Sequence, residues 1–71
     1  MAEEVRAEMV ANVLRVEVSE GDVVTSTDPL MVLESMKMEI PVLAEHGGTV
    51  ARIAVTEGDV VQEGDLLAVL S

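Results

Sequence analysis

The chain contains no aromatic residue and no cysteine, and only 4 of its 71 residues are lysine or arginine. Without aromatic rings or disulfides, the core must be built from Val, Leu, Ile, Met and Ala. These residues are plentiful, because hydrophobic residues make up 49% of the chain. A chain of this length predicts a single domain over residues 1–71, close to the lower size limit for independent folding.

Positive charge is scarce, and 14 acidic residues give a formal net charge of −10. A surface this negative repels nucleic-acid phosphates and anionic lipid headgroups, so the sequence argues against nucleic-acid and membrane partners. The charge favours solubility and is compatible with partners that present basic surfaces. No apolar run approaches the roughly 18 residues of a membrane span, and no signal-peptide pattern is visible. We therefore expect a cytoplasmic location.

The hydrophobic pattern is typical of β-strands. Residues 12–18 are rich in valine and alternate in character, as a half-buried strand does. Two short apolar runs, residues 30–33 and 66–70, are also too short to favour helices. The matched segments Glu20-Gly21-Asp22 and Glu57-Gly58-Asp59 predict turns, because Gly and Asp are common turn residues. The sequence therefore predicts an all-β fold.

The two halves of the chain resemble each other. Residues 13–24 align with residues 50–61 at an offset of 37, and about half of the residues from 13 to 34 are identical to their images. Each half has about four short strands and could not bury its apolar face alone. We therefore predict a flattened β-barrel or sandwich of two four-stranded antiparallel sheets related by a pseudo-twofold axis. In this alignment the image of residues 38–43 is the segment Met1–Arg6.

The single lysine, Lys37, lies between two predicted strands at the junction of the halves. Strands over residues 30–35 and 38–43 leave only Met36 and Lys37 to reverse the chain. Two-residue hairpin turns favour type I′ geometry, which needs positive φ at both central residues and normally uses Asn or Gly. Since neither residue suits that geometry, the turn indicates selection for something other than stability.

The run Glu34-Ser35-Met36-Lys37-Met38 resembles the signature of biotinyl domains, in which the modified lysine lies between two methionines after a small residue. Related lipoyl domains commonly have an acidic residue before the lysine and a small residue after it. The resemblance covers nearly the whole chain and includes both Gly-Asp turns. It implies a small free-standing member of the biotin/lipoyl attachment family.

The resemblance implies that a biotin protein ligase joins biotin to Lys37 as an amide. The domain would then carry a carboxyl group between biotin carboxylase and carboxyltransferase components, as a non-catalytic and monomeric carrier. Met36 and Met38 would contact the ligase or the cofactor, although core filling is the other interpretation, and one of them would then pack inward. Glu34, Ser35 and Glu39 are candidates for ligase recognition.

Two other functions remain open from the sequence. One is a lipoyl carrier of an acyl-transfer complex, and the other is an interaction or storage module that bears biotin without serving a carboxylase. The chain also departs from the family pattern, with Glu8 and Ala11 where a Pro and a Gly are usual. If the position of Ala11 requires positive φ, the substitution costs roughly 1 kcal/mol. His46 has no neighbouring histidine or cysteine, so we expect a turn residue and no metal site.

Overall fold

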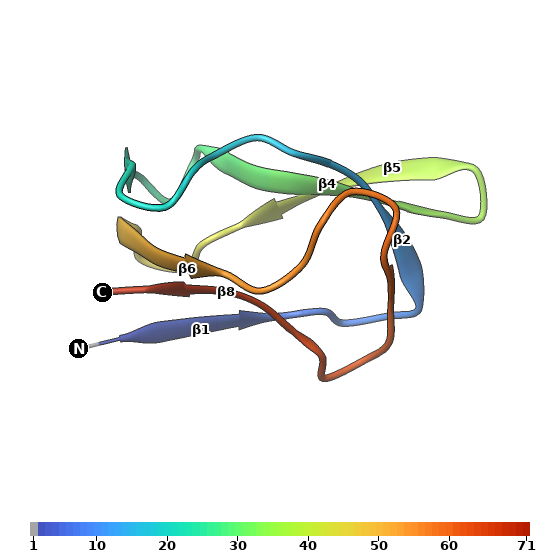
Figure 1. The fold of residues 1–71 in the computed structure, drawn as a ribbon. Coiled ribbons are helices and arrows are strands. Elements are labelled where there is room, and N and C mark those ends of the chain that lie inside the picture. Colours follow the sequence, from blue (N-terminus) through green and yellow to red (C-terminus); the bar gives the residue numbers. More distant parts are fainter. Residues whose placement is uncertain (1) are drawn as a thin grey trace.

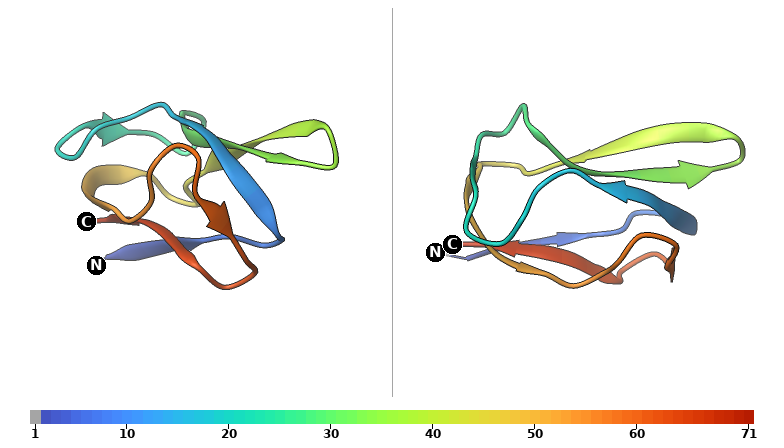
Figure 2. Two further views of the ribbon diagram at one scale, coloured as in Figure 1. Left: turned by 45° about the vertical axis from the view of Figure 1, so that its right-hand side comes forward. Right: turned by 45° about the horizontal axis from the view of Figure 1, so that its top comes forward.

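Eight short strands form the fold in a computed structural model that describes residues 2–71. They are β1 (Glu3–Arg6), β2 (Ala11–Val16), β3 (Val23–Val24), β4 (Pro29–Ser35), β5 (Met38–Leu43), β6 (Gly48–Ile53), β7 (Val60–Val61) and β8 (Leu66–Leu70). One sheet has the order β1-β8-β6-β3 and the other has the order β5-β4-β2-β7. The two sheets face each other as layers of a flattened barrel (Figures 1 and 2). The predicted all-β fold is confirmed.

The pseudo-twofold symmetry extends to the register of the strands. In the β4–β5 pair, Leu33 lies opposite Ile40, and in the β8–β1 pair their images Leu70 and Glu3 lie opposite each other. The three following pairs of each ladder also correspond, and both ladders have an irregularity at the same place. Met1, the first residue of the predicted image segment, lies outside the described residues.

The Glu-Gly-Asp turns hold the two halves together. The N–H of Gly21 donates to the carbonyl of Val50 at 2.7 Å, and the N–H of Gly58 donates to the carbonyl of Val13 at 2.8 Å. Each turn thus donates a hydrogen bond to a strand of the other half. The two donors, and likewise the two acceptors, are 37 positions apart, which is the offset of the repeat. Both glycines have positive φ, 97° and 94°, which glycine adopts at little cost. Each copy of the repeated turn therefore binds the other half of the domain.

The core lies between the sheets and is entirely apolar among residues 2–71. Its fully buried side chains with the largest volumes are Leu30, Met31, Leu67, Leu70, Val13 and Val50. They come from β2, β4, β6 and β8, the inner strands of the two sheets. Because aliphatic side chains fill this narrow space, the barrel needs neither aromatic residues nor a prosthetic group to close its interior.

Both prolines occupy positions where a missing N–H is tolerated. Pro29 is the first residue of β4, and Pro41 lies in β5, an edge strand. The concern about Ala11 is not realised, because the non-glycine residues with positive φ among those described are Met36 and Lys37 alone. Ala11 is instead a buried residue of β2, where a small side chain fits. Substituting alanine at this position therefore introduces no left-handed strain.

Candidate functional site

The β4–β5 hairpin projects from one end of the elongated barrel, which measures 32 × 19 × 18 Å (Figure 1). Ser35 pairs with Met38, so Met36 and Lys37 alone form the turn. Their φ angles are 53° and 66°, both in the left-handed region. The predicted two-residue turn with positive φ is thereby confirmed. Since L-residues with a Cβ disfavour this region, the turn stores strain at the position of the single lysine.

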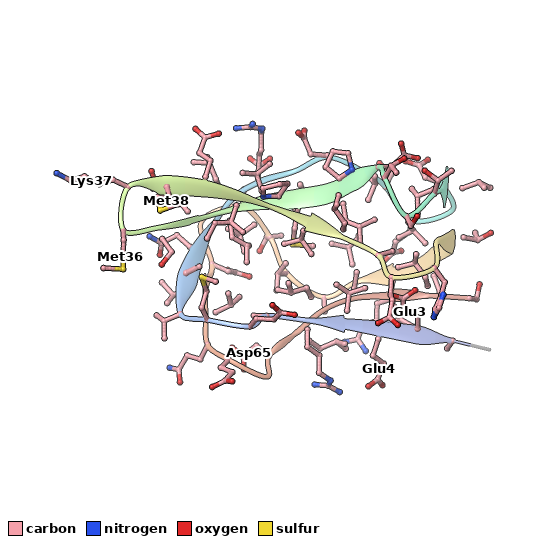
Figure 3. All side chains as sticks on the ribbon, turned by 180° about the vertical axis from the view of Figure 1, so that it is seen from behind. Glu3, Glu4, Met36, Lys37, Met38 and Asp65 are labelled. Atoms are coloured by element: carbon pink, nitrogen blue, oxygen red, sulfur yellow. The ribbon has the colours of Figure 1, made fainter. Side chains whose placement is uncertain are left out.

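Lys37 points away from the body of the barrel at the hairpin tip (Figure 3). Met36 beside it is 92% exposed, and Met38 is 64% exposed. The interpretation that one methionine packs inward is therefore wrong. By strand alternation Met38 shares the inner face of β5 with Ile40, but the hairpin tip extends past the opposite sheet. The tip thus presents an amine between two accessible thioethers.

Glu34 and Glu39 lie directly opposite each other at the base of the turn, and both are exposed. Like charges opposite each other in a ladder are destabilising. Arg15 of β2 partly offsets this, with its Nη2 at 3.6 Å from Oε1 of Glu39. The exposed position makes the pair weak in energy. The site therefore combines one amine with two carboxylates that remain accessible to a basic partner.

Ser35 has a structural role that the sequence did not reveal. Its hydroxyl donates a hydrogen bond to the carbonyl of Val10 at 3.1 Å. Val10 belongs to the loop before β2, 25 positions earlier in the chain, so no local pattern could have indicated the contact. This bond joins that loop to the hairpin and makes one continuous surface beside Lys37.

A second cluster of contacts lies at the opposite end of the barrel, around Glu3. Its carboxylate accepts hydrogen bonds from the backbone N–H groups of Glu45 and His46, which precede β6. The bond from Glu45 lowers the pKa of Glu3 below its ordinary value. This contact orders the β5–β6 connection, far from the lysine (Figure 3).

His46 lies in that connection, with its Nε2 3.5 Å from the carboxylate of Glu45 and its side chain 78% exposed. Within residues 2–71 no three side chains of His, Cys, Asp and Glu come together as metal ligands would. The same stretch holds no helix with the length and hydrophobicity of a membrane span.

The family model described as "Biotin-requiring enzyme" matches residues 3–70. The chain belongs to this biotin/lipoyl attachment family. Among curated proteins, the biotinylated protein TB7.3 homologue of Mycobacterium leprae is 67% identical over 48 residues, which cover 68% of each chain. The homologue of Mycolicibacterium smegmatis is 68% identical over 44 residues, covering 62% of each chain. The second alignment thus spans less than two thirds of that relative's length.

Solved structures extend the likeness of the attachment domain to larger proteins. A Kluyveromyces lactis urea carboxylase matches all of this chain with a TM-score of 0.93 and 34% identity, over 6% of its own length. A single-chain, multi-domain long-chain acyl-CoA carboxylase matches 96% of this chain with a TM-score of 0.88 and 35% identity, over 7% of its length. The lipoyl domain of the Azotobacter vinelandii 2-oxoglutarate dehydrogenase complex gives 0.76 and 27%, covering 94% of this chain and 95% of its own.

Proposed function

We propose that this attachment domain is a biotin carrier, biotinylated at Lys37 by a biotin protein ligase. The observation that carries the proposal is the single lysine at the tip of a strained turn, flanked by two exposed methionines. The modified domain shuttles a carboxyl group between the biotin carboxylase and carboxyltransferase components of a biotin-dependent carboxylase. Likeness to domains within two carboxylases supports this role.

The residues of the tip fit the modification step. The Nζ atom of Lys37 attacks the carbonyl carbon of an activated biotinyl adenylate, loses a proton and displaces AMP as an amide forms. An exposed amine at a projecting turn can enter a ligase active site without unfolding the barrel. Met36, Met38 and the two glutamates at the base of the turn contact the ligase, whose complementary surface would be apolar and basic.

Biotin supplies a ureido nitrogen that carries the carboxyl group. The contribution of the protein is to hold Lys37 at a fixed, accessible point on a rigid body. Tethering raises the effective concentration of the carried group at each active site to roughly millimolar levels, without tight docking at either one. Under this proposal the domain is a substrate and carrier, with no catalytic residue of its own, and acts as a cytoplasmic monomer.

The principal alternative is a lipoyl carrier of an acyl-transfer complex, since a lipoyl domain shares the fold. The methionines on both sides of Lys37 favour biotin, as do relatives whose names describe biotinylated proteins. A third possibility is a biotin-bearing interaction or storage module that serves no carboxylase.

The attachment site is tested by intact mass spectrometry of protein co-produced with a biotin protein ligase. The wild type should gain one biotinyl group, and Lys37→Arg should gain none while keeping its circular dichroism spectrum. A matched control, Lys37→Arg combined with Arg52→Lys, keeps one exposed lysine but moves it to β6, and it should also remain unmodified. Biotin on either variant, or a lipoyl mass on the wild type, would contradict the assignment.

The carrier role is tested with biotinylated protein and purified biotin carboxylase, ATP and labelled bicarbonate. Label should become bound to the wild-type protein and then pass to an acyl acceptor when carboxyltransferase is added. Biotinylated protein that accepts no label from any carboxylase component would favour the storage module.

A further inference from the structure

A groove lies beside the turn, between the hairpin and the loop before β2. It has a volume of about 530 Å³ and is lined by Met9, Val10, Ala11, Asn12, Glu34, Ser35 and Met36. We call this the tip groove. The groove is open to solvent, so it offers one face to a ligand and does not enclose it. The residue next to its edge is Lys37.

The walls of the tip groove are apolar and exposed. Met9 is 40% exposed, Val10 is 63% exposed and Met36 is 92% exposed. The hydrogen bond from the Ser35 hydroxyl to the Val10 carbonyl fixes the two walls relative to each other. Three large apolar side chains on two separate segments therefore converge beside the modified amine, where no packing requirement of the core explains them.

The floor of the groove adds two polar groups. Asn12 and Glu34 lie directly opposite each other in the β2–β4 pair. Within residues 2–71 neither side chain takes part in a hydrogen bond or an ion pair. An amide offers both donors and an acceptor, and a carboxylate offers acceptors only. Together they match a ligand that presents N–H groups and a carbonyl oxygen on one edge and an apolar face on the other.

We propose that the tip groove is a resting site for the ring system of the biotinyl group carried on Lys37. The sulfur-containing ring lies against Met9, Val10 and Met36. The ureido edge donates an N–H to the Glu34 carboxylate, and its carbonyl accepts from the Asn12 amide. This inference rests on the proposed function, because it assumes biotin as the tethered group.

The covalent attachment is the reason for choosing this occupant. Because the tether begins one residue from the groove, docking is intramolecular and needs little affinity to be populated. A weak site also suits a carrier, since the ring must leave it to enter each enzyme. The groove between β1 and β5, with a volume of about 250 Å³, is the competing location, and its apolar walls include Val5 and Ile40.

The test uses protein labelled with ¹³C at the methionine methyl groups, which gives one reporter in each wall of the groove. Biotinylated protein is compared with protein acetylated at Lys37, a control that removes the same positive charge but adds no ring. The Met9 and Met36 signals should shift in the biotinylated form relative to the acetylated form. Met31, which is fully buried, should not move. Nuclear Overhauser contacts between ring protons and the Val10 methyls should accompany the shifts.

A matched pair of variants locates the contact. Val10→Ser should abolish the difference between biotinylated and acetylated protein, whereas Val23→Ser should preserve it. Both valines are exposed, 63% and 80%, so neither change disturbs the core. Coincident Met9 and Met36 signals in the two acylated forms would overturn the inference, as would ring contacts at Val5 or Ile40.

Failure of the resting site can be distinguished from failure of the proposed carrier function. If a ligase fails to modify Lys37, the carrier assignment fails, but an activated ester of biotin still acylates the amine. The ester also acylates the N-terminal amine. Ester-biotinylated protein is therefore compared with protein treated with the corresponding acetyl ester. Ligase-modified protein without the methyl shifts would refute the resting site and leave biotin attachment intact.

Discussion

The turn that holds Lys37 should reduce the stability of the domain, and glycine at position 36 should recover part of that loss. Met36 has a φ of 53°, and left-handed backbone costs a non-glycine residue about 1–2 kcal/mol. Glycine removes this cost but loses about 0.5–1 kcal/mol of backbone entropy on folding. The side chain is 92% exposed, so its removal uncovers little apolar surface. Met36→Gly should therefore stabilise the domain by about 0.5–1 kcal/mol.

Thermal unfolding followed by far-ultraviolet circular dichroism measures this change, since the chain has no aromatic residue to report by fluorescence. For a domain of this size the gain corresponds to a rise of about 2–8 °C in the midpoint. The matched control is Met38→Gly, because Met38 is also exposed but lies in β5 without positive φ. That variant should lose about 0.5–1 kcal/mol. If the two variants lose stability equally, the turn is not strained and the reasoning is refuted.

Two further changes test the supporting structure. Glu3→Gln should lower the thermal midpoint most at neutral pH. Hydrogen bonding lowers the pKa of Glu3 in the folded state below its ordinary value of about 4.5. The carboxylate therefore stabilises the fold above that value, and this stabilisation is lost as pH falls through the folded pKa. A difference from wild type that persists undiminished near pH 2 would contradict this. Gly48→Ala should cost more than Gly21→Ala in urea unfolding, because both have positive φ but only the Cβ at position 48 would lie 2.6 Å from a backbone oxygen, that of Ser71. Equal losses would show that the backbone relaxes freely there.

Much of the fold could be predicted because the two halves of the sequence repeat the same pattern of strands and turns. The repeated Gly-Asp turns fixed the strand spacing, and the positions of Met36 and Lys37 followed from the strands on either side. These are local signals, set by residues a few positions apart. The strained turn was recognisable because the residues there are poor ones for its geometry.

Contacts between distant segments were not predictable in the same way. The Ser35 hydroxyl reaches Val10, and the Glu3 carboxylate reaches the backbone of Glu45, at separations of 25 and 42 residues. Strand alternation puts Met38 on the same face of β5 as Ile40, but its exposure of 64% shows that the opposite sheet does not cover it. The length of each layer relative to its partner is a tertiary property, which single-strand patterns do not encode.

The duplication also places the start of β1 and the end of β8 away from the turn that holds Lys37. The β8–β1 pair has the register of the β4–β5 pair, but it is not closed by a turn and instead leads to the two chain ends. The start of β1 and the end of β8 lie together at the end of the barrel opposite the β4–β5 hairpin (Figure 1). Chain joined at either terminus would therefore leave the lysine, the methionines and the tip groove unobstructed. This arrangement is compatible with an attachment domain that stands alone and with one that is a small part of a long chain, such as the 6% of a urea carboxylase that this chain matches.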